Sequence, residues 1–372
     1  MTIGWSRRMR TILLGLCILL FTTVTLPHAS AAATGQEVLG PSSNPWEASY
    51  IWRPVVIDTG SGFMMWYSGE ANNGVDNIGL ATSKDGMSWS RYLQNPVLRI
   101  GSAGQWDVGS VNEPWVIQDG GQYKMWYSGQ TYTGTFPSNY TILTWSIGYA
   151  TSPDGIHWVK YPANPIFTPG PSGSWDDYET HRPIILTIGS SYVMYYHGVN
   201  HQGVSQTGIA TSTDGISWTR KGMMPPIPKG KWDAGYASTQ LSSVTVAPDG
   251  YLLAYYGWEN QQTTHSQIGF ASSTDGTSST PYPNNPVIAP EISGIAFDSG
   301  GVEYPMVITV GDNYYVYYAG FASAGESVGL AILPTSQFPI PEFASPELLT
   351  IAVMLTSGTL LLSRRRLNIS RL

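Results

Sequence analysis

The stretch WEASYIWRPVVIDTGSGFMMWYSGEANNGVDNIGLATSKDGMSWSRYLQNP, from Trp46 to Pro96, contains a pattern that returns four more times. It begins with an aromatic residue followed by an acid, and a proline comes eight positions after the aromatic residue. Such internal similarity is the sequence signature of a repeat architecture. We call the repeats units 1 to 5. Their aromatic–acid pairs are Trp46-Glu47, Trp106-Asp107, Trp175-Asp176, Trp232-Asp233 and Phe297-Asp298.

Each unit is expected to form four short strands joined by polar turns. In unit 1 the proline segment is followed by a glycine turn, an aromatic strand at residues 64–69 and a third strand at residues 78–83. Asp85-Gly86 and its counterparts then supply hairpin turns, because Asp-Gly suits the positive φ that such turns need. Four antiparallel strands, repeated radially, make a blade of a β-propeller. We therefore predict an all-β fold over residues 34–338, a five-bladed β-propeller with four antiparallel strands per blade.

Repeated and non-repeated positions suggest different roles. The aromatic residue recurs because every blade must pack alike, and the acids Asp107, Asp176 and Asp233 are expected to bind backbone amides between neighbouring blades. The proline is replaced only in unit 4, by Gln240. The longest insertion runs from Thr131 to Trp145 in unit 2.

Composition narrows the function classes. The chain has 372 residues, a formal net charge of −7 and no Lys/Arg cluster between its two ends, so it lacks the basic footprint of a nucleic-acid-binding protein. The only cysteine is Cys17, in the N-terminal apolar stretch, which excludes a disulfide, a thiolate metal site or a cysteine nucleophile from the rest of the chain. A neutral or weakly polar ligand fits this composition better.

The N-terminus has the features of a secretory signal peptide, which we predict over residues 1–33. Three arginines between positions 7 and 10 precede an apolar run from Ile12 to Phe21, and small residues follow at 29–33. A membrane anchor is the alternative, but ten apolar residues are too few to cross a bilayer, which takes about 20.

The C-terminus, residues 339–372, is predicted to be a sorting or transmembrane tail. Pro341-Glu342-Phe343 precedes an apolar segment, Leu348 to Leu362, and an arginine cluster at 364–366. This order resembles the PEF-CTERM type of sorting tail, which implies an extracellular domain anchored at the cell surface. The extension at 367–372 departs from that pattern, and an ordinary membrane span is the alternative. In either case the tail is expected to be the chain's contact with a membrane.

The candidate site lies where the innermost strands of the blades reach the mouth of the funnel. Residues just before the repeat proline should face this mouth, and they differ from unit to unit, as a site shared by five blades allows. Glu179 lies slightly earlier in unit 3, and His197 is a further candidate. The residues before the proline position are Trp52, Arg53, Asn112, Glu113, His181, Arg182, Ser238, Thr239, Glu303 and Tyr304.

These residue types suit carbohydrate chemistry. Aromatic faces stack on sugars, and carboxylates and amides bind sugar hydroxyls. Hydrolysis of a glycosidic bond uses two carboxyl groups about 5–5.5 Å apart for retention and about 6.5–9.5 Å apart for inversion. Glu113, Glu179 and Glu303 lie in three different units and are the catalytic candidates. An adjacent arginine would lower the pKa of such a carboxyl group, and an apolar surrounding would raise it.

The mature chain resembles the five-bladed glycosidases, above all glycoside hydrolase family 43 and its relatives in families 32 and 130. Asn112-Glu113-Pro114 looks like a catalytic-acid position of family 43. Tyr196-His197-Gly198-Val199 is similar to a family 130 segment on the phosphate-binding side of the pocket. Two positions depart from family 43: Arg53 stands where that family has its general base, and Arg182 stands near the place of its pKa-tuning acid.

Three functions remain open at this point. The first is a secreted glycoside hydrolase, with Glu113 as the acid and Glu179 or Glu303 as its partner. The second is a non-catalytic surface propeller that binds glycans. The third is a glycoside phosphorylase that holds phosphate with Arg53, His181, Arg182 and His197. We expect a monomer that binds an oligo- or polysaccharide and has no cofactor, although a calcium ion on the axis stays open.

Overall fold

The computed structural model describes residues 32–135, 139–235, 240–247, 250–258, 265–292, 296–323 and 325–339. The predicted signal peptide, apart from its last two residues, and the predicted C-terminal tail beyond residue 339 lie outside these ranges. Within the described residues, no helix is long and apolar enough to span a bilayer.

The described chain is all-β, as predicted, apart from two short 3-10 turns, Pro45–Glu47 and Thr335–Gln337. The largest sheet has the order β18 (Gly301–Val310), β19 (Asn313–Ala322), β20 (Gly325–Pro334), β2 (Tyr50–Asp58), β3 (Phe63–Glu70), β4 (Asp76–Ser83) and β5 (Trp89–Arg91), and β1 (Gln36–Leu39) pairs with β20. Its two halves are joined by one parallel pairing, between Tyr50 and Glu326.

The remaining strands form three further sheets, each in sequence order and antiparallel. They are β6 (Ser110–Asp119), β7 (Gln122–Thr135), β8 (Asn139–Ser152) and β9 (Val159–Lys160); β10 (Glu179–Ile188), β11 (Ser191–Val199), β12 (Ser205–Ser212) and β13 (Thr219–Met223); and β14 (Gln240–Ala247), β15 (Gly250–Gly257), β16 (Gln267–Ser273) and β17 (Thr280–Pro281).

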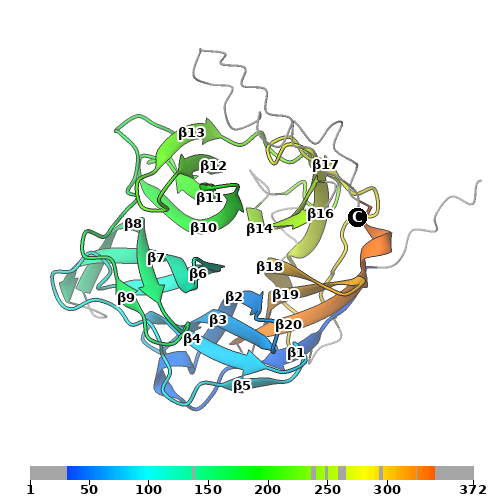
Figure 1. Ribbon diagram of the computed structural model, residues 1–372, viewed down its shortest axis with the longest axis horizontal. Helices are drawn as coiled ribbons and strands as arrows, with labels where there is room; N and C mark the ends of the chain where they lie inside the picture. The colour runs from blue at the N-terminus through cyan, green and yellow to red at the C-terminus, as the bar shows by residue number, and fades with distance from the viewer. Residues whose placement is uncertain are drawn as a thin grey trace, which may run out of the picture. The chain divides into compact units, whose positions relative to one another are not determined.

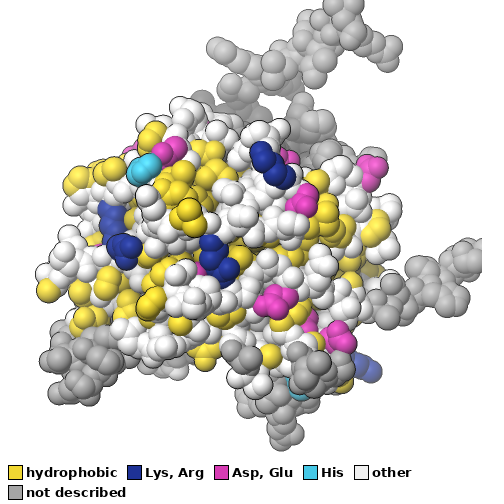
Figure 2. Space-filling view, turned by 90° about the horizontal axis from the view of Figure 1, so that it is seen from below, with side chains coloured by type: hydrophobic (Ala, Val, Ile, Leu, Met, Phe, Trp, Pro, Cys, Tyr) yellow, Lys and Arg dark blue, Asp and Glu magenta, His cyan; other side chains and the backbone are white. Residues whose placement is uncertain are grey.

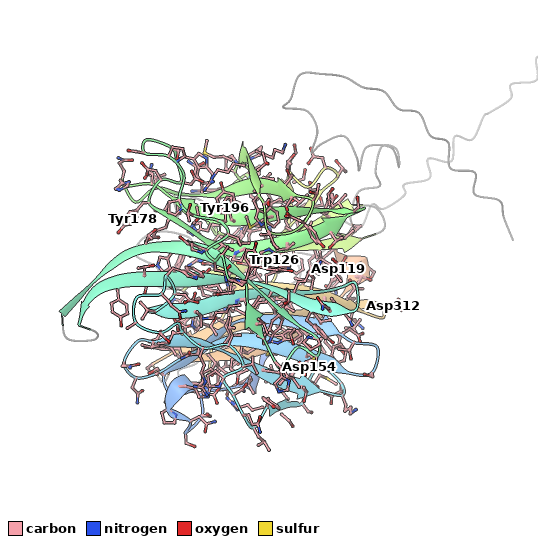
Figure 3. All side chains as sticks on the ribbon, turned by 60° about the vertical axis from the view of Figure 1, so that its left-hand side comes forward. Asp119, Trp126, Asp154, Tyr178, Tyr196 and Asp312 are labelled. Carbon is pink, nitrogen blue, oxygen red and sulfur yellow. The ribbon has the colours of Figure 1, made fainter. Side chains whose placement is uncertain are left out.

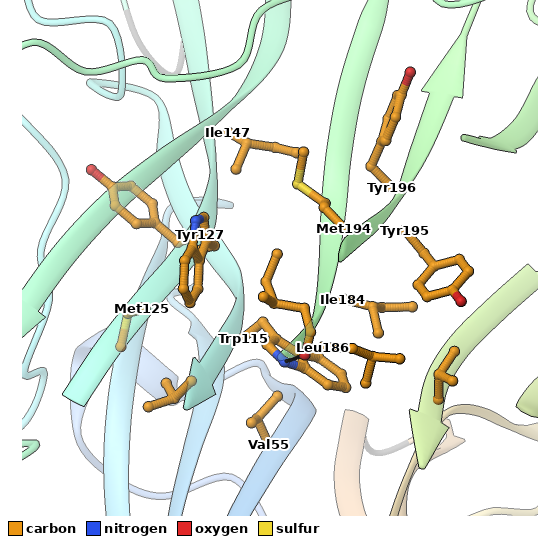
Figure 4. Close-up of a cluster of buried hydrophobic side chains, with 14 of the residues drawn as sticks. Val55, Trp115, Met125, Tyr127, Ile147, Ile184, Leu186, Met194, Tyr195 and Tyr196 are labelled. Atoms are coloured by element: carbon orange, nitrogen blue, oxygen red, sulfur yellow. Dashed lines mark hydrogen bonds between the residues drawn. The ribbon is translucent and has the colours of Figure 1, made fainter. Parts of the chain in front are cut away.

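The sheets are arranged around a common centre, with β2, β6, β10, β14 and β18 nearest to it (Figure 1). This is a propeller-like arrangement, in which the first strand of each repeat lines the middle. The predicted insertion in unit 2 is a continuation of β7 and β8, which project beyond the neighbouring strands (Figure 3). The hydrophobic core fills the space between adjacent sheets: Met125, Tyr127 and Ile147 of one sheet lie near Ile184 and Met194 of the next (Figure 4).

The aromatic–acid pair holds each unit together from within. In unit 1 the Trp46 ring covers the second and third strands so closely that a Cβ added at Gly69 or Gly79 would lie 2.3 or 2.4 Å from it. The acid next to it, Glu47, accepts a hydrogen bond from Tyr67 (2.8 Å) and forms an ion pair with Arg91 (2.9 Å).

Units 2 and 3 repeat this arrangement with Asp107, Tyr127 and Lys160 and with Asp176, Tyr196 and Arg220. The prediction that these acids bind amides between blades is therefore wrong for Asp107 and Asp176. A buried carboxylate is better stabilised by a phenol and a cation of its own unit than by the more distant backbone of the next.

Contacts between units come instead from the Asp-Gly turns. An aromatic side chain of the second strand in one unit donates a hydrogen bond to the turn glycine of the next: Trp66 to Gly155 (2.9 Å), Trp126 to Gly215 (2.8 Å), Tyr195 to Gly276 (2.7 Å), and Tyr317 to Gly86 (2.8 Å). In unit 4 the corresponding residue is Ala254, and unit 5 has no Asp-Gly pair in its sequence. We call these four contacts the turn clamps.

Candidate functional site

Four residues immediately before the repeat prolines have a strained backbone. Arg53, Glu113, Arg182 and Tyr304 have φ of 56°, 51°, 55° and 52°, a left-handed conformation that non-glycine residues rarely adopt. The strand register shifts at each of these positions. Such bulges redirect a side chain, and strain of this kind gathers at functional sites. We call these four the floor residues, because their side chains meet at the centre.

Unit 4 differs from the prediction in its register. Gln240 pairs with Tyr256, just as Trp52 pairs with Ser68, so it occupies the position two before the proline and not that of the proline. The reason is a longer connection: Gln240 comes eight positions after Trp232, whereas Trp52 comes six after Trp46. The predicted binding residue Thr239, and Ser238 before it, lie outside the described residues.

Glu113 is 3% exposed and fully engaged by its neighbours. Its two carboxylate oxygens accept hydrogen bonds from Arg182 Nε (2.8 Å), Ser128 Oγ (2.7 Å) and His181 Nδ1 (3.1 Å). Burial alone would raise the pKa of Glu113, but His181, Arg182 and Arg53 together hold it well below its usual 4.5. Glu113 is therefore a carboxylate at neutral pH, which disfavours the role of proton donor that the sequence suggested.

Arg182 connects several strands at the centre. Besides Glu113, its guanidinium donates hydrogen bonds to Gln240 Oε1 (3.1 Å), the Tyr256 hydroxyl (3.1 Å) and the Tyr304 hydroxyl (3.5 Å). With these four acceptors its guanidinium is a fixed part of the site. We infer that Arg182 holds Glu113 in place and shapes the floor.

Arg53 has a different environment. It is 6% exposed, lies over the Tyr304 ring (5.0 Å), and has no hydrogen bond or ion pair with any residue that the structure describes. Burial lowers the pKa of this guanidinium, with Arg182 adding to the effect and Glu113 opposing it. A buried cation that has no hydrogen-bond or ion-pair partner among the described residues is a candidate group for binding an anionic ligand.

Glu303 is the acid with an elevated pKa. It is 8% exposed, and burial raises its pKa to about 7 against the opposing influence of Arg182 and Arg53. Nearby, burial also raises the pKa of Glu326 to about 8 and that of Asp76 to about 7. None of these three forms an ion pair with a Lys or Arg among the described residues. A carboxyl group kept protonated near neutral pH can donate a proton.

Glu179 lies at the edge of the site. Its carboxylate is 3.9 Å from His181 Nε2, and burial raises its pKa above 4.5, with Glu113 adding to the effect. His181 also contacts His197, whose Nδ1 lies 2.9 Å from His181 Nε2. On its other side the Trp145 ring stacks on His181, with centroids 5.9 Å apart and planes 26° apart.

The other predicted residues take supporting positions. Trp52 packs against Tyr304 with ring centroids 5.3 Å apart. The Asn112 side chain donates a hydrogen bond to Asp76 (2.8 Å). The structure thus brings Arg53, Arg182, both histidines, Glu113 and Tyr304 together. The Asn112 side chain is bonded to Asp76 and not to this group.

Several functional residues were missed by sequence reasoning. All but Gln240, which is on the first strand of unit 4, lie on the second and third strands, at positions level with the predicted ring. One signal could have found most of them: apart from Ser68 and Ser128, which occupy the same position in units 1 and 2, they do not repeat from unit to unit. They are Ser68, Ser128, Gln240 and Tyr256 on or beside the floor, and Asp76, Trp145 and Glu326 around it.

Beneath the floor residues there is almost no free space. A cavity of about 10 Å³, near the minimum that one water molecule needs, is lined by three floor residues and by Pro54, Pro114, Pro183 and Pro305. The repeat prolines therefore close the centre below the site. No group of three or more His, Cys, Asp or Glu side chains in the described parts of the chain is arranged to hold a metal ion. On the face seen in Figure 2, charged side chains occur singly or in small groups.

Comparison with known proteins gives partial matches in sequence. No protein-family model matches the chain. Two uncharacterized proteins of Mycobacterium tuberculosis are 34% identical over 149 residues, which is 40% of this chain and 45% of each relative, so the chain spans under half the length of these relatives. A 1,2-β-oligomannan phosphorylase of Thermoanaerobacter sp. is 24% identical over 315 residues, covering 80% of this chain and 95% of that protein.

Solved structures share the fold. A putative glycosidase from Bacteroides thetaiotaomicron has a TM-score of 0.59 at 21% identity, covering 80% of this chain and 96% of that one. A β-1,2-mannobiose phosphorylase from Listeria innocua, bound to β-1,2-mannobiose, has a TM-score of 0.61 at 15% identity, covering 81% and 95%. The chain therefore has the propeller-like fold of these carbohydrate-active proteins.

Proposed function

We propose that this protein is a carbohydrate-active enzyme that hydrolyses a glycosidic bond at the centre of a five-bladed propeller. Five blades follow if the eight-stranded sheet is counted as two, divided at its single parallel pairing between Tyr50 and Glu326. Relatives and structural neighbours that act on mannosides or are named glycosidases support the substrate class.

The observation that carries the proposal is Glu303. Its pKa of about 7 keeps a large fraction of this buried carboxyl group protonated at neutral pH. Breaking a glycosidic bond requires a proton on the leaving oxygen, and a carboxylic acid with a raised pKa supplies it in glycosidases. We therefore assign the proton-donor role to Glu303, whereas the ionised Glu113 organises the basic side of the site.

A second candidate function, phosphorolysis, is favoured by Arg53. Its buried guanidinium lacks a partner among the described residues, and phosphate is an anion that arginine binds well. In that case phosphate would attack the anomeric carbon in place of water, and Glu303 would keep the same role. The relatives named phosphorylases support this alternative.

We further propose that the enzyme works outside the cell and is held at the surface by its C-terminal tail. This rests on the sequence features of residues 1–33 and 339–372. Free phosphate is scarce outside cells, so this location favours hydrolysis over phosphorolysis.

The decisive experiment is a cleavage assay with β-1,2-mannobiose and a panel of 4-nitrophenyl glycosides, with and without phosphate. Release of free sugar without phosphate, lost in Glu303→Gln and kept in the exposed control Glu37→Gln, supports hydrolysis. A sugar phosphate formed only with phosphate, and lost in Arg53→Met, would establish the second candidate. Glycan binding without any cleavage across the panel would contradict both and leave a binding protein.

A further inference from the structure

Glu113, His181 and His197 form a continuous hydrogen-bonded chain from three different strands. Glu113 Oε2 lies 3.1 Å from His181 Nδ1, and His181 Nε2 lies 2.9 Å from His197 Nδ1. The outer end of the chain, His197 Nε2, is buried and has no hydrogen-bond partner among the described residues. A chain of this kind with one vacant end is arranged to pass a proton.

The proton positions follow from the chemistry of the chain. Glu113 is ionised, and an ionised carboxylate only accepts hydrogen bonds, so His181 Nδ1 carries a hydrogen. In a neutral His181 the Nε2 atom then has a lone pair, so the bond to His197 requires a hydrogen on His197 Nδ1. Burial, with Arg182 and Arg53 adding to the effect, holds the pKa of His197 well below 6.5, so its ring is neutral and Nε2 has a free lone pair.

Two carboxyl groups lie close to the His181 ring. Glu113 lies 3.1 Å from Nδ1 and Glu179 lies 3.9 Å from Nε2. The face of Trp145 stacks on the ring at 5.9 Å, a distance at which aromatic faces attract cations. His197 has no such partners, and Arg53 and Arg182 both disfavour a charge on it. A proton taken up at His197 is therefore best balanced by moving the charge to His181.

We propose that His197 Nε2 is the base of the hydrolytic reaction and that His181 and Glu113 form a proton relay behind it. His197 Nε2 takes a proton from water as the water oxygen bonds to the anomeric carbon. At the same time the His197 Nδ1 proton passes to His181 Nε2, and the imidazolium charge forms beside Glu113. The glycosidic C–O bond breaks, and Glu303 gives its proton to the leaving oxygen. Solvent then removes the proton from the relay and reprotonates Glu303.

This inference rests on the proposed function, which it completes by supplying a base. In glycosidases that use two carboxyl groups, the second carboxylate is the base or nucleophile. Here Glu113 is held in an ion pair with Arg182. Here the base is an imidazole, and Glu113 is a positioning residue that acts through His181. His197 contacts water in the reaction and is a catalytic residue.

The kinetic test uses whichever substrate of the panel the wild-type chain cleaves without phosphate. We expect His197→Gln to lower kcat by about 100-fold or more with KM nearly unchanged, as for loss of a general base. Added imidazole should restore part of the activity of His197→Ala. His201→Gln, an exposed histidine paired with Asp177, is the matched control and should keep full activity. An unchanged kcat in His197→Gln, or cleavage that requires phosphate, would overturn the relay.

A second measurement does not depend on turnover. ¹⁵N spectra of the histidine rings in the full chain, in phosphate-free buffer at pH 7, report which ring nitrogen carries the hydrogen. The relay requires a hydrogen on Nδ1 and a bare Nε2 in both His181 and His197, and a change of this pattern in Glu113→Gln. A protonated His197 Nε2 would overturn the relay even if Glu303→Gln abolishes cleavage. If Glu303→Gln still cleaves the substrate while the histidine rings show the expected pattern, the proposed function is contradicted instead.

Discussion

At the scale of single residues, the site separates charges of opposite sign. The floor arginines and His181 surround Glu113, while Glu303, Asp76 and Glu326 have no cationic ion-pair partner among the described residues. The pKa values hold Glu113 in its charged form and the three carboxyl groups of the second set in their neutral form up to about pH 7. The division assigns binding to one side and proton donation to the other.

The proposed hydrolytic activity should fall as the pH rises through about 7. Glu303 must be protonated to donate a proton, and its pKa of about 7 places the loss of the acid form there. The measurement is the pH dependence of kcat on the cleaved substrate. A rate that stays constant from pH 6 to pH 9 would contradict the role of Glu303.

Stability should also decrease with rising pH, because the three carboxyl groups have raised pKa values. Each binds its proton more tightly in the folded state, so its contribution is full below the unfolded pKa of about 4 and is lost as the pH rises through about 7 to 8. Urea unfolding at pH 5 and pH 8.5 measures the difference. Glu326→Gln should reduce it, and an equal difference in that variant would count against the assignment.

The two floor arginines should respond oppositely to removal. Arg182→Met leaves Glu113 buried without its ion-pair partner, which typically costs about 3–5 kcal/mol. Arg53→Met removes a buried charge that has no described partner, so stability should be unchanged or higher. Urea unfolding of both variants at pH 7 tests the contrast, which fails if Arg53→Met is the more damaging change.

At the scale of strands and turns, the turn clamps determine how one repeat meets the next. In each clamp the N–H or O–H group of a buried aromatic side chain donates a hydrogen bond to a glycine carbonyl of the neighbouring turn. Ala254 replaces the aromatic residue where the next unit has no Asp-Gly pair, which shows that the aromatic residue serves the turn.

Trp126→Phe should therefore destabilise the protein by about 0.5–1.5 kcal/mol, because it removes one of the two indole donors to the Gly215 carbonyl, leaves Trp218 as the other, and largely keeps the apolar packing. Thermal and urea unfolding measure the loss. The control is Trp89→Phe, since the Trp89 indole is only half-buried and bonds to Gly86 in its own turn. Equal losses in the two variants would argue against a special role for the clamp.

The strands, and most of the residues that meet at the candidate site, could be predicted because both depend on residue pattern. The repeat of aromatic residues, Asp-Gly turns and prolines identifies the all-β fold, and the non-repeating residues before the prolines identify Arg53, Glu113 and Arg182. Two things could not be read from the sequence. The extra length before Gln240 shifts the register by an amount that only strand pairing reveals. The protonation of Glu113 and Glu303 depends on which charges lie nearby in space, and the linear order does not show this.

At the scale of the whole molecule, the repeats form a ring that is closed twice by different means. β1 pairs with β20, and the Tyr50–Glu326 pairing joins the last unit to the first. Units 1 to 4 are joined in sequence by turn clamps, and unit 5 is joined to unit 1 by Tyr317. Between units 4 and 5 the described residues contain no such clamp, so this junction depends more on apolar packing, such as that of Phe270 on Tyr314.

The prolines beneath the floor have a consequence for turnover. The cavity lined by Arg53, Glu113 and Tyr304 has a volume of about 10 Å³, which is near the space of one water molecule. A sugar is too large to pass through it. In the proposed reaction, the product therefore leaves by the route along which the next substrate molecule enters. Product and substrate share one entrance and one site, so we expect the released sugar to be a competitive inhibitor. Its affinity for the site should then limit the rate of turnover.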